Sequence, residues 1–337
     1  MDHPYALRQI HPPQTQPKFS PLMLTIPFFT ALEPSQNILI AGAGGGYDIF
    51  SGLPLYWSLR AAGKNVHLAN LSFSFLNPLE QKLAPKMVAV TAETQRHTEF
   101  FPEQFLAQWF REHEGIEISI YCFEQTGVQP LLRCYQTLSN HLNLDTIILV
   151  DGGTDSLMRG DEDGLGTPTE DMTSICAVNQ LPIPNKFLLC LGFGVDHYHG
   201  VSNHFSFETI ADLTKAGGYL GAFSLTQQMP EAQKYQAATE YVFRHMPKLE
   251  SIVSASILSA ISGNFGDIHT LERTKNGKLW INPLMAIYWC FNLTHVANRI
   301  LYLDAIKHTT EYMEVRAYIQ DFRRSLPVLR KRQPLPD

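Results

Sequence analysis

Residues 146–171 read TIILVDGGTDSLMRGDEDGLGTPTED, an apolar run that passes directly into an acidic, glycine-rich loop. The run TIILV has the length and the β-branched composition of a buried strand. The segment closes on a helix start, in which we expect Thr167 at the N-cap, Pro168 at the first helical position and Glu170 as partner in a capping box. An acidic loop between a buried strand and a helix lies where open α/β sheets bind ligands.

The chain on either side of this segment alternates strands with helices. Strands are predicted at residues 37–43, 66–73, 116–123, 146–150, 187–193 and 219–225. Helices are predicted at residues 48–62, 99–113, 130–142, 169–179, 207–216 and 231–245. Nearly continuous apolar runs are typical of strands buried on both faces. The pattern therefore predicts an α/β protein with a doubly wound, mostly parallel sheet.

The two ends of the chain depart from this alternation. We interpret residues 1–36 as an N-terminal arm that packs on the body, and residues 37–325 as a single α/β domain. From about residue 250 this domain is expected to become helical. Helices are predicted there at residues 251–262, 285–303 and 310–324, with a short strand at 279–282. The basic tail at 326–337 and the acidic run at 161–163 are expected to be solvated.

Composition narrows the class of protein. With 45% hydrophobic and 17% charged residues, the 337-residue chain can bury a substantial core. The net charge of −6 gives no reason to expect a nucleic-acid partner. Five cysteines without a CxxC motif are typical of reduced thiols. Residues 1–19 lack the features of a signal peptide, and the apolar run at 22–32 is too short to span a bilayer. We expect a cytoplasmic protein with a small-molecule substrate and no membrane partner; a homo-oligomer is compatible with this reading.

The first predicted strand opens into a glycine turn, AGAGGGYD at residues 41–48. Glycine lets a backbone turn tightly and approach a ligand closely. The helix that follows would direct its free N–H groups at the same place, which favours an anion. The residues assigned to phosphate or ligand binding are Gly42, Gly44, Gly45, Gly46 and Asp48. A turn that merely packs on its neighbours is the alternative.

This turn departs from the motifs of known nucleotide sites. The third glycine of the dinucleotide pattern is replaced by Tyr47, and no acid follows the second strand to hold a ribose. No Lys-Ser or Lys-Thr pair follows the turn, so it is not a P-loop. Asp48 would repel a phosphate unless a cation bridges them. The pattern therefore favours a divalent cation over NAD(P) as the cofactor.

The acidic loop supplies candidate ligands for that cation. Asp151 and Asp155 are carboxylates four residues apart at a strand end, and Mg²⁺, Mn²⁺ and Ca²⁺ take oxygen ligands of this type. Gly152 and Gly153 would let the loop wrap around a ligand. Arg159 is either a bidentate clamp for a phosphate or carboxylate, or the partner of an acid in the loop.

Residues 194–200, GVDHYHG, supply candidate acid/base groups after the fifth predicted strand. Aspartate beside histidine offers either a general base with its orienting partner or a mixed set of metal ligands. We assign Asp196, His197 and His199 as catalytic. The carboxyl ends of parallel strands lie on one edge of a sheet, so at least one imidazole should face the same cleft as Asp151.

The motifs GAGGGYD (42–48) and DGGTDSLMRGDEDGLGTPTEDM (151–172) resemble those of an uncharacterised family of bacterial and archaeal Rossmann-like proteins. The resemblance covers roughly residues 35–300. It implies a Rossmann-like fold and a single site that contains both motifs, and it implies no particular reaction. A fainter similarity is to nucleoside hydrolases, whose Asp-rich strand-end loops hold Ca²⁺. Their early D-x-D-x-G-x-D-D loop is replaced here by residues 42–48.

These features together predict an enzyme that acts on a small phosphorylated or nucleotide-like molecule, by metal-assisted hydrolysis or group transfer. Two alternatives stay open. One is an NAD(P)-dependent oxidoreductase with a variant turn, and the other is a protein that binds a small ligand without catalysis.

Overall fold

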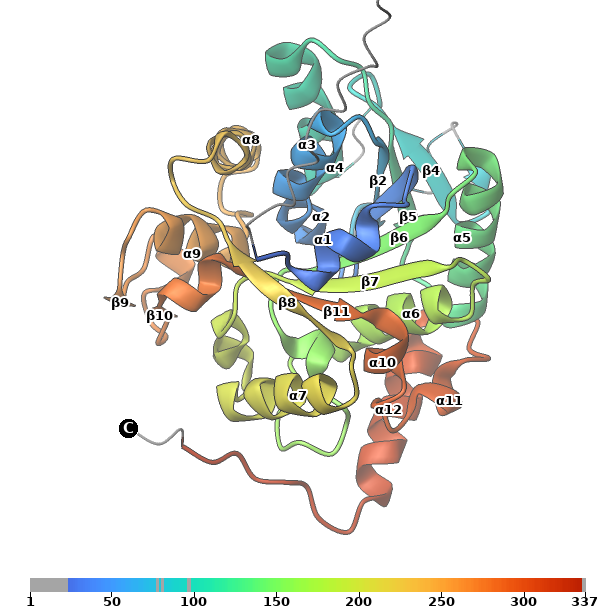
Figure 1. Ribbon diagram of the computed structural model, residues 1–337, viewed down its shortest axis with the longest axis vertical. Helices are drawn as coiled ribbons and strands as arrows, with labels where there is room; N and C mark the ends of the chain where they lie inside the picture. Colours follow the sequence, from blue (N-terminus) through green and yellow to red (C-terminus); the bar gives the residue numbers. More distant parts are fainter. Residues whose placement is uncertain (1–23, 77–78, 80–81, 96–97, 335–337) are drawn as a thin grey trace, which may run out of the picture.

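The computed structural model describes residues 24–334 except 77–78, 80–81 and 96–97 (Figure 1). In this part of the chain, nine strands form one sheet in the order β3-β4-β5-β2-β1-β6-β7-β11-β8, and β9 pairs with β10. The strands are β1 (Asn37–Gly42), β2 (Asn65–Ser72), β3 (Lys82–Ala84), β4 (Met87–Val90), β5 (Ile120–Glu124), β6 (Thr146–Asp151), β7 (Asn185–Cys190), β8 (Tyr219–Ser224), β9 (Gly266–Asp267), β10 (Trp280–Ile281) and β11 (Ile287–Asn292).

Helices surround this sheet. The α-helices are α1 (Pro27–Leu32), α2 (Asp48–Ser51), α3 (Leu53–Ala61), α4 (Pro102–Trp109), α5 (Val128–Leu142), α6 (Pro168–Asn179), α7 (Asn203–Lys215), α8 (Pro230–His245), α9 (Ile252–Ile261), α10 (Leu293–Ala297), α11 (Leu303–Ile306) and α12 (Tyr312–Ser325). Short helical turns are η1 (Phe110–Glu114), η2 (Asp155–Leu157), η3 (Val195–His199), η4 (Glu272–Thr274) and η5 (Pro283–Ala286). Among the described residues, no helix is long and apolar enough to cross a membrane.

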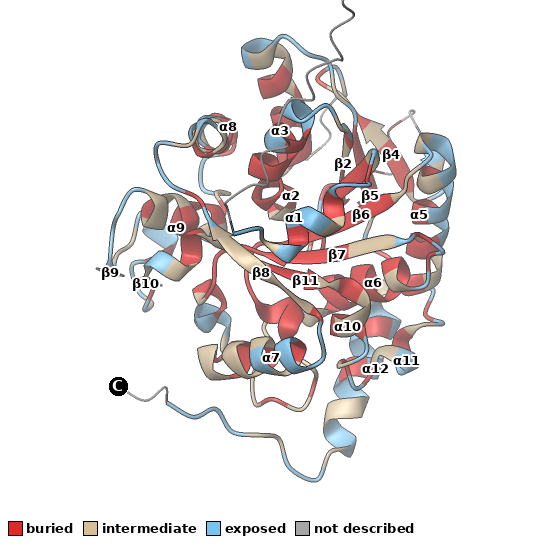
Figure 2. Ribbon diagram, viewed as in Figure 1, coloured by how far each residue is buried: buried red, intermediate tan, exposed pale blue. Residues whose placement is uncertain are grey.

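The sheet has a hydrophobic core on each face. Along β1, Ile38 and Ile40 join a cluster with α2, α3, α4 and α8, while Leu39 and Ala41 join another with α5, α6 and α12. Successive side chains of a strand point to opposite faces, so a strand covered on both sides must be apolar throughout. The central strands are accordingly buried (Figure 2). The prediction of an α/β fold with a mostly parallel sheet is confirmed.

The strand order reverses at β1. Strands β2 and β5 lie on one side of β1, and β6 and β7 lie on the other. The chain therefore leaves β1 towards one edge of the sheet and leaves β6 towards the opposite edge. Loops that diverge from adjacent parallel strands open a crevice between them, which is where ligands bind in open α/β sheets. The glycine turn follows β1 and the acidic loop follows β6, so both lie at this crevice.

The predicted helix at 285–303 is wrong. Residues 287–292, IYWCFN, form strand β11, which lies between β7 and β8 and is antiparallel to both. Aromatic and β-branched residues favour a strand in such a position. The helix begins only at Leu293, where the Asn292 side chain accepts a hydrogen bond from the His295 N–H at 3.2 Å. The C-terminal part is helical, with one strand of the central sheet inserted.

Smaller corrections concern element boundaries. The predicted helix at 48–62 is divided at Gly52 into α2 and α3, and the one at 99–113 ends in the π-helical turn η1. An antiparallel hairpin, β3–β4, extends one edge of the sheet and was not predicted. Within the N-terminal arm, Phe28 of α1 is buried against Phe187 and Phe223. Residues 1–23 of the arm lie outside the described part.

The acidic run at 161–163 is not freely solvated, contrary to expectation, and Arg330 of the tail contacts it. Residues 327–328 and 331–334 of the tail are exposed. Glu162 has no exposed surface, because it pairs with Arg330 at 3.1 Å and accepts the Gly160 N–H at 2.8 Å. Arg330 also pairs with Asp161 at 2.9 Å. Its backbone donates to the Asp161 carbonyl at 2.8 Å and accepts the Asp163 N–H at 2.9 Å. The ion pairs of Arg330 therefore hold this part of the tail against the acidic loop.

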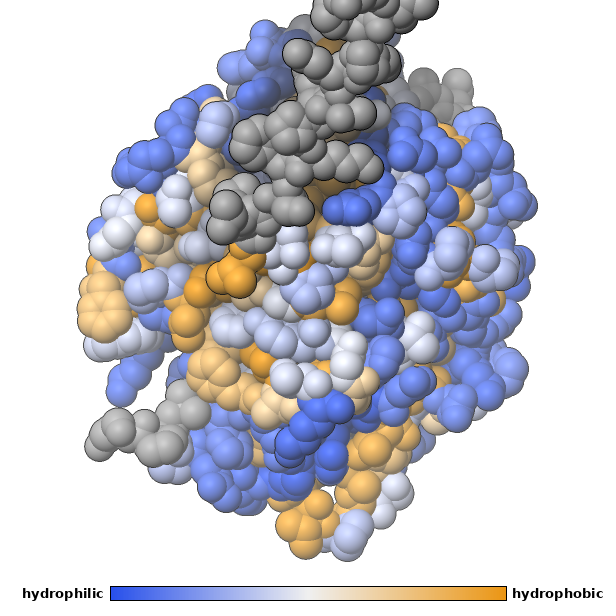
Figure 3. All heavy atoms as spheres, viewed as in Figure 1, coloured by the Kyte–Doolittle hydropathy of each residue, from blue (hydrophilic) through white to orange (hydrophobic). Residues whose placement is uncertain are grey.

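The outer surface agrees with a protein whose apolar residues lie mainly inside. Hydrophilic residues cover most of the region over α5 in Figure 3. All five cysteines are buried and free, as the sequence predicted.

Candidate functional site

A pocket of about 370 Å³ lies at the carboxyl ends of β1, β6 and β7. The predicted site residues that line it are Gly44, Gly45, Gly46, Asp48, Asp151, Gly152, Asp155, Asp196 and His199. Asp171, Phe73, Phe100, Tyr47 and Arg273 line it as well. Loops that follow β1, β2, β6 and β7 contribute to the pocket, together with Phe100, residues 249–253 and Arg273. Most of its ionisable groups are carboxylic acids.

Three carboxylates converge inside the pocket. Oxygen atoms of Asp48, Asp151 and Asp171 all lie within 4.8 Å of one another. Asp48 is in the first turn of α2, Asp151 is the last residue of β6, and Asp171 is in the first turn of α6. Acidic side chains are favoured in a first helical turn, because the helix dipole is positive there. Asp48 at the start of α2 and Asp171 at the start of α6 therefore lie close to Asp151 at the end of β6.

Asp48 connects the glycine turn after β1 with the acidic loop after β6. Its carboxylate accepts hydrogen bonds from the Gly44 N–H at 2.6 Å and from the Gly152 N–H at 3.3 Å. Burial raises the pKa of Asp48 to about 7, and the charges of Asp155 and Glu170 add to this effect. The backbone hydrogen bonds act in the opposite direction.

Asp151 and Asp171 are almost fully enclosed, with 2% of each residue exposed. Asp151 accepts hydrogen bonds from the Ser156 hydroxyl and, at 3.3 Å, from its N–H. The Asp171 Oδ1 atom has no hydrogen-bond partner in the described part of the protein. Burial, followed by the negative charge of Asp155, raises the pKa of both acids well above the usual range. A buried carboxylate oxygen without a partner is costly, so this atom marks an unsatisfied position.

Gly44 keeps the space between these acids open. A Cβ atom at Gly44 would lie 2.9 Å from both carboxylate oxygens of Asp171 and from the Oδ2 atom of Asp48. Any side chain there would crowd the carboxylates of Asp48 and Asp171, two of the three convergent acids. Gly45 and Gly46, with φ of +86° and +59°, form the turn that places Gly44 at this point.

Asp155 is not among the three convergent acids, although it lines the pocket. Its Oδ2 atom accepts hydrogen bonds from the Thr167 N–H at 2.8 Å and from the Thr167 hydroxyl at 3.2 Å. Thr167 precedes α6 as predicted, but its side chain is used by Asp155 and does not cap the helix. The predicted capping box is wrong, since Glu170 accepts from the Gln125 side chain at 3.0 Å instead.

Two of the predicted ligand-binding glycines do not line the pocket. A Cβ atom at Gly42 would lie 2.1 Å from the Asn70 Oδ1 atom, and one at Gly153 would lie 2.3 Å from Asp196 Oδ2. Both glycines therefore permit close packing within the protein. Gly152 is different, because it faces the pocket and donates its N–H to Asp48.

Arg159 does not line this pocket either. It donates two hydrogen bonds to the Asp161 carboxylate, from Nε at 2.9 Å and from Nη2 at 2.6 Å. These bonds lower the pKa of Asp161 to about 2. Of the two roles considered for Arg159, pairing with an acid of its own loop is the one seen in the structure.

The histidines are separated by the turn that carries them. Asp196 and His199 line the acidic pocket, whereas His197 lines two cavities elsewhere. Residues two apart share a face only in extended chain, and residues 195–199 form a 3₁₀ turn. Asp196 accepts the Thr154 N–H at 2.6 Å. Burial raises the pKa of Asp155, and the charge of His199 opposes that shift.

Asp171 is the site residue that sequence reasoning missed. It belonged to the acidic segment but was treated as part of a helix start. A signal was present, because Asp171 and Asp48 occupy the same kind of position, the first turn of a helix after a sheet strand.

Comparisons with known proteins give one match. The model of the family described as "Protein of unknown function (DUF1152)" matches residues 79–323. This range includes Asp151, Asp171 and His199, and it begins after the glycine turn. No curated protein and no solved structure matched the chain.

Proposed function

The chain belongs to the DUF1152 family of proteins of unknown function, and we propose that its acidic pocket binds a divalent cation and acts on a small phosphorylated or nucleotide-like molecule. Asp48, Asp151 and Asp171 would hold the cation. The observation that carries this proposal is the convergence of three carboxylates on one point, where the Asp171 Oδ1 atom lacks a partner.

Electrostatics supports a cation at this point. Carboxylates within a few ångströms repel one another strongly when they are removed from water. The raised pKa values of Asp48, Asp151 and Asp171 express that repulsion together with burial. A hard cation such as Mg²⁺, Mn²⁺ or Ca²⁺ would replace the repulsion by attraction, and carboxylate oxygens are its preferred ligands.

The surroundings of the acids favour hydrolysis or group transfer. A divalent cation polarises a phosphoryl oxygen and makes a bound water more acidic. His199 is exposed at the same pocket and would accept or donate the proton. Asp196 accepts a backbone hydrogen bond beside it and would keep the turn in place.

An NAD(P) cofactor suits the pocket less well. The glycine turn meets two carboxylates, Asp48 and Asp171, where a dinucleotide would place its pyrophosphate. At the end of β2, the Asn70 side chain donates to the Gly46 carbonyl and to Glu103, each at 2.8 Å. Asn70 therefore supports the turn from within, where the dinucleotide motif would require an acid facing a ribose.

Calorimetric titration with Mg²⁺, Mn²⁺ and Ca²⁺ tests the cation site. We expect binding that Asp171→Asn and Asp151→Asn weaken at least tenfold, while Asp155→Asn weakens it less because Thr167 already engages that carboxylate. Asp304→Asn, at a side chain that is 96% exposed, is the control for loss of one negative charge. No heat and no thermal shift with any of the three ions would remove the cation from the proposal.

Turnover distinguishes an enzyme from a binding protein. With the bound ion present, we would follow phosphate release from a panel of phosphate monoesters and nucleotides. His199→Asn should lower kcat about a hundredfold, whereas His197→Asn, two residues away and outside the pocket, should not. Ion binding without turnover of any phosphorylated compound would favour the non-catalytic alternative.

A further inference from the structure

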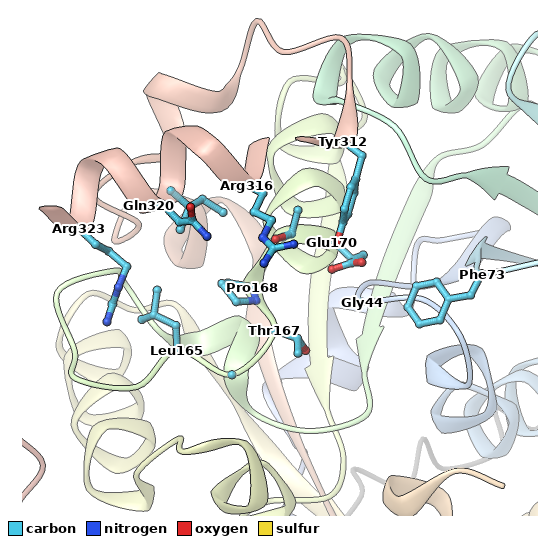
Figure 4. Close-up of a pocket in the computed structure, with 13 residues that line it drawn as sticks. Gly44, Phe73, Leu165, Thr167, Pro168, Glu170, Tyr312, Arg316, Gln320 and Arg323 are labelled. Carbon is cyan, nitrogen blue, oxygen red and sulfur yellow. The ribbon is translucent and has the colours of Figure 1, made fainter. Parts of the chain in front are cut away.

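A second cavity, of about 560 Å³, adjoins the acidic pocket. Gly44, Phe73 and Thr167 line both. Figure 4 shows Arg316 and Arg323 of α12 along one side of the cavity and Phe73 at the opposite end. The start of α6, at Pro168, lies between them. We call this space the Arg316 cavity; it is lined by Gly44, Phe73, Leu165, Gly166, Thr167, Pro168, Thr169, Glu170, Tyr312, Arg316, Ile319, Gln320 and Arg323.

Arg316 is the available cation of this cavity. Within the described part of residues 24–334, Arg316 forms no ion pair and no hydrogen bond. Figure 4 shows its side chain near Pro168 and Glu170. Arg323 differs, because it donates to the Gly160 carbonyl at 3.0 Å and to the Glu162 carbonyl at 2.8 Å. Arg323 adds positive charge, but its Nη1 atom already donates to two backbone carbonyls. Arg316 has its five donors free for a ligand.

The start of α6 contributes to the same wall. This helix has twelve residues, and the side chain of its N-cap residue, Thr167, forms no capping hydrogen bond to it in the described structure. That side chain is bonded to Asp155 instead. Pro168 has no N–H, and the Glu170 carboxylate bonds to its own backbone N–H. Thr169, which lines the cavity, therefore supplies the uncapped N–H at the start of the helix. Free N–H groups and the positive end of the helix dipole attract anions.

The two spaces are complementary in charge. The acidic pocket repels a bare phosphate, while the Arg316 cavity presents an unpaired guanidinium beside a helix start. Gly44, which has no side chain, lies at their boundary, so one ligand can extend from one space into the other. Glu170 is the opposing charge in the cavity, and its carboxylate accepts hydrogen bonds from the Gln125 side chain and from the Tyr312 hydroxyl.

We propose that the Arg316 cavity binds a phosphate group of the substrate. The proposal rests on the function proposed above and narrows the substrate class to a molecule with two polar ends. One end ligates the cation held by Asp48, Asp151 and Asp171. The other end is a phosphate that pairs with Arg316 and accepts a hydrogen bond from the Thr169 N–H at the start of α6.

Titration of the full chain with inorganic phosphate, in the presence of a chelator, tests this site independently of the cation. We expect wild-type binding that weakens with added salt and that Arg316→Ala weakens at least tenfold, as expected for loss of a charge-assisted pair. Arg316→Lys should restore part of the affinity, because it keeps the charge and loses the bidentate geometry. Glu170→Gln should strengthen binding by removing the opposing charge.

Arg324→Ala is the matched control. It removes one positive charge from the same helix, at an exposed residue that pairs with Asp321 and does not line the cavity. Equal loss of affinity in Arg324→Ala and Arg316→Ala would overturn the proposal, as would the absence of phosphate binding to the wild type. Cation binding without phosphate binding would reject only the Arg316 site. Phosphate binding with no response to any cation would reject only the proposed metal site.

Discussion

The Asp48 carboxylate accepts a hydrogen bond from the Gly152 N–H, and this bond joins the helix after β1 to the loop after β6. A second bond from the Gly44 N–H fixes the same side chain from the other side. Asp48 and Asp151 are therefore held in place by backbone hydrogen bonds before any ligand is present. A site preorganised in this way loses little conformational entropy on binding.

The first prediction is that Asp171→Asn stabilises the metal-free protein while it weakens cation binding. The substitution removes one negative charge from a buried cluster, and its amide can donate to the neighbouring carboxylates. We expect a gain in the free energy of unfolding of about 1 kcal/mol, from relief of repulsion and of an unsatisfied atom. Urea unfolding with a chelator measures it. With saturating Mn²⁺ the wild type should become the more stable of the two proteins. A variant that is less stable than the wild type both with the chelator and with Mn²⁺ would contradict the prediction.

The second prediction concerns pH. In the folded state the pKa of Asp48 is about 7, compared with an ordinary value of 3.8. Between these values the folded state retains a proton that the unfolded chain has released, so the free energy of unfolding should fall as the pH rises from about 4 to about 7. The raised pKa values of Asp151 and Asp171 act in the same direction.

A saturating divalent cation should flatten this dependence, because it binds the deprotonated carboxylates. Thermal unfolding at pH 4.5 and pH 7.5, with and without Mn²⁺, makes the comparison. An identical decline in both series would show that these acids are not linked to an ion. The lowered pKa of Asp161, about 2, contributes only below this window.

The third prediction is that Gly44→Ala blocks the cation and leaves the fold intact. The added methyl would lie 2.9 Å from both Asp171 oxygens and from Asp48 Oδ2, so it would crowd two of the three acids that are proposed to hold the ion. Gly44 has no positive φ, and alanine is therefore compatible with its backbone. Circular dichroism and cation titration together test this outcome, and normal ion affinity in Gly44→Ala would place the ion elsewhere.

Gly45 provides the contrast. Its φ is +86°, and a Cβ atom would lie 2.6 Å from the Leu71 carbonyl oxygen. Gly45→Val should therefore destabilise the fold itself, so the loss of ligand binding in that variant says little about direct contact.

The fourth prediction concerns the tail. Arg330→Ala leaves Glu162, which is fully buried, without its ion-pair partner and should cost about 3 kcal/mol of stability. Lys331→Ala removes the same charge from the next residue and should change stability by less than about 0.5 kcal/mol. Urea unfolding of the two variants provides the measurement. Equal stabilities would mean that the tail contributes nothing to the folded loop.

The fold was largely readable from the sequence, because strands buried on both faces leave long apolar runs such as residues 146–150. The helix predicted at 285–303 failed for a related reason. A short apolar run such as IYWCFN at 287–292 does not distinguish a buried strand from a helix by periodicity. The neighbouring strands β7 and β8, which decide the matter, are distant in sequence.

The site was readable only in part. The segments that meet at the switch point were identified, since strand ends of a parallel sheet share an edge. The spacing of the acids does not reveal which of them joins Asp48 and Asp151, because that depends on hydrogen-bond partners. Asp155 accepts a hydrogen bond from Thr167, whereas the Asp171 Oδ1 atom has no partner in the described structure. The burial of Glu162 also depended on Arg330, which lies in the C-terminal tail, 168 residues further along the chain.

The position of β11 has a consequence for how the protein is made. Strand β8 joins the sheet only through β11, which is synthesised more than sixty residues later. While the ribosome is still producing residues 225–286, the edge of β7 lacks its neighbour and β8 has no strand to pair with. Unpaired edges of this kind are prone to associate with other chains. Completion of the sheet must therefore wait until residues 287–292 have been synthesised, and a pause or truncation before residue 287 would leave the edge of β7 exposed.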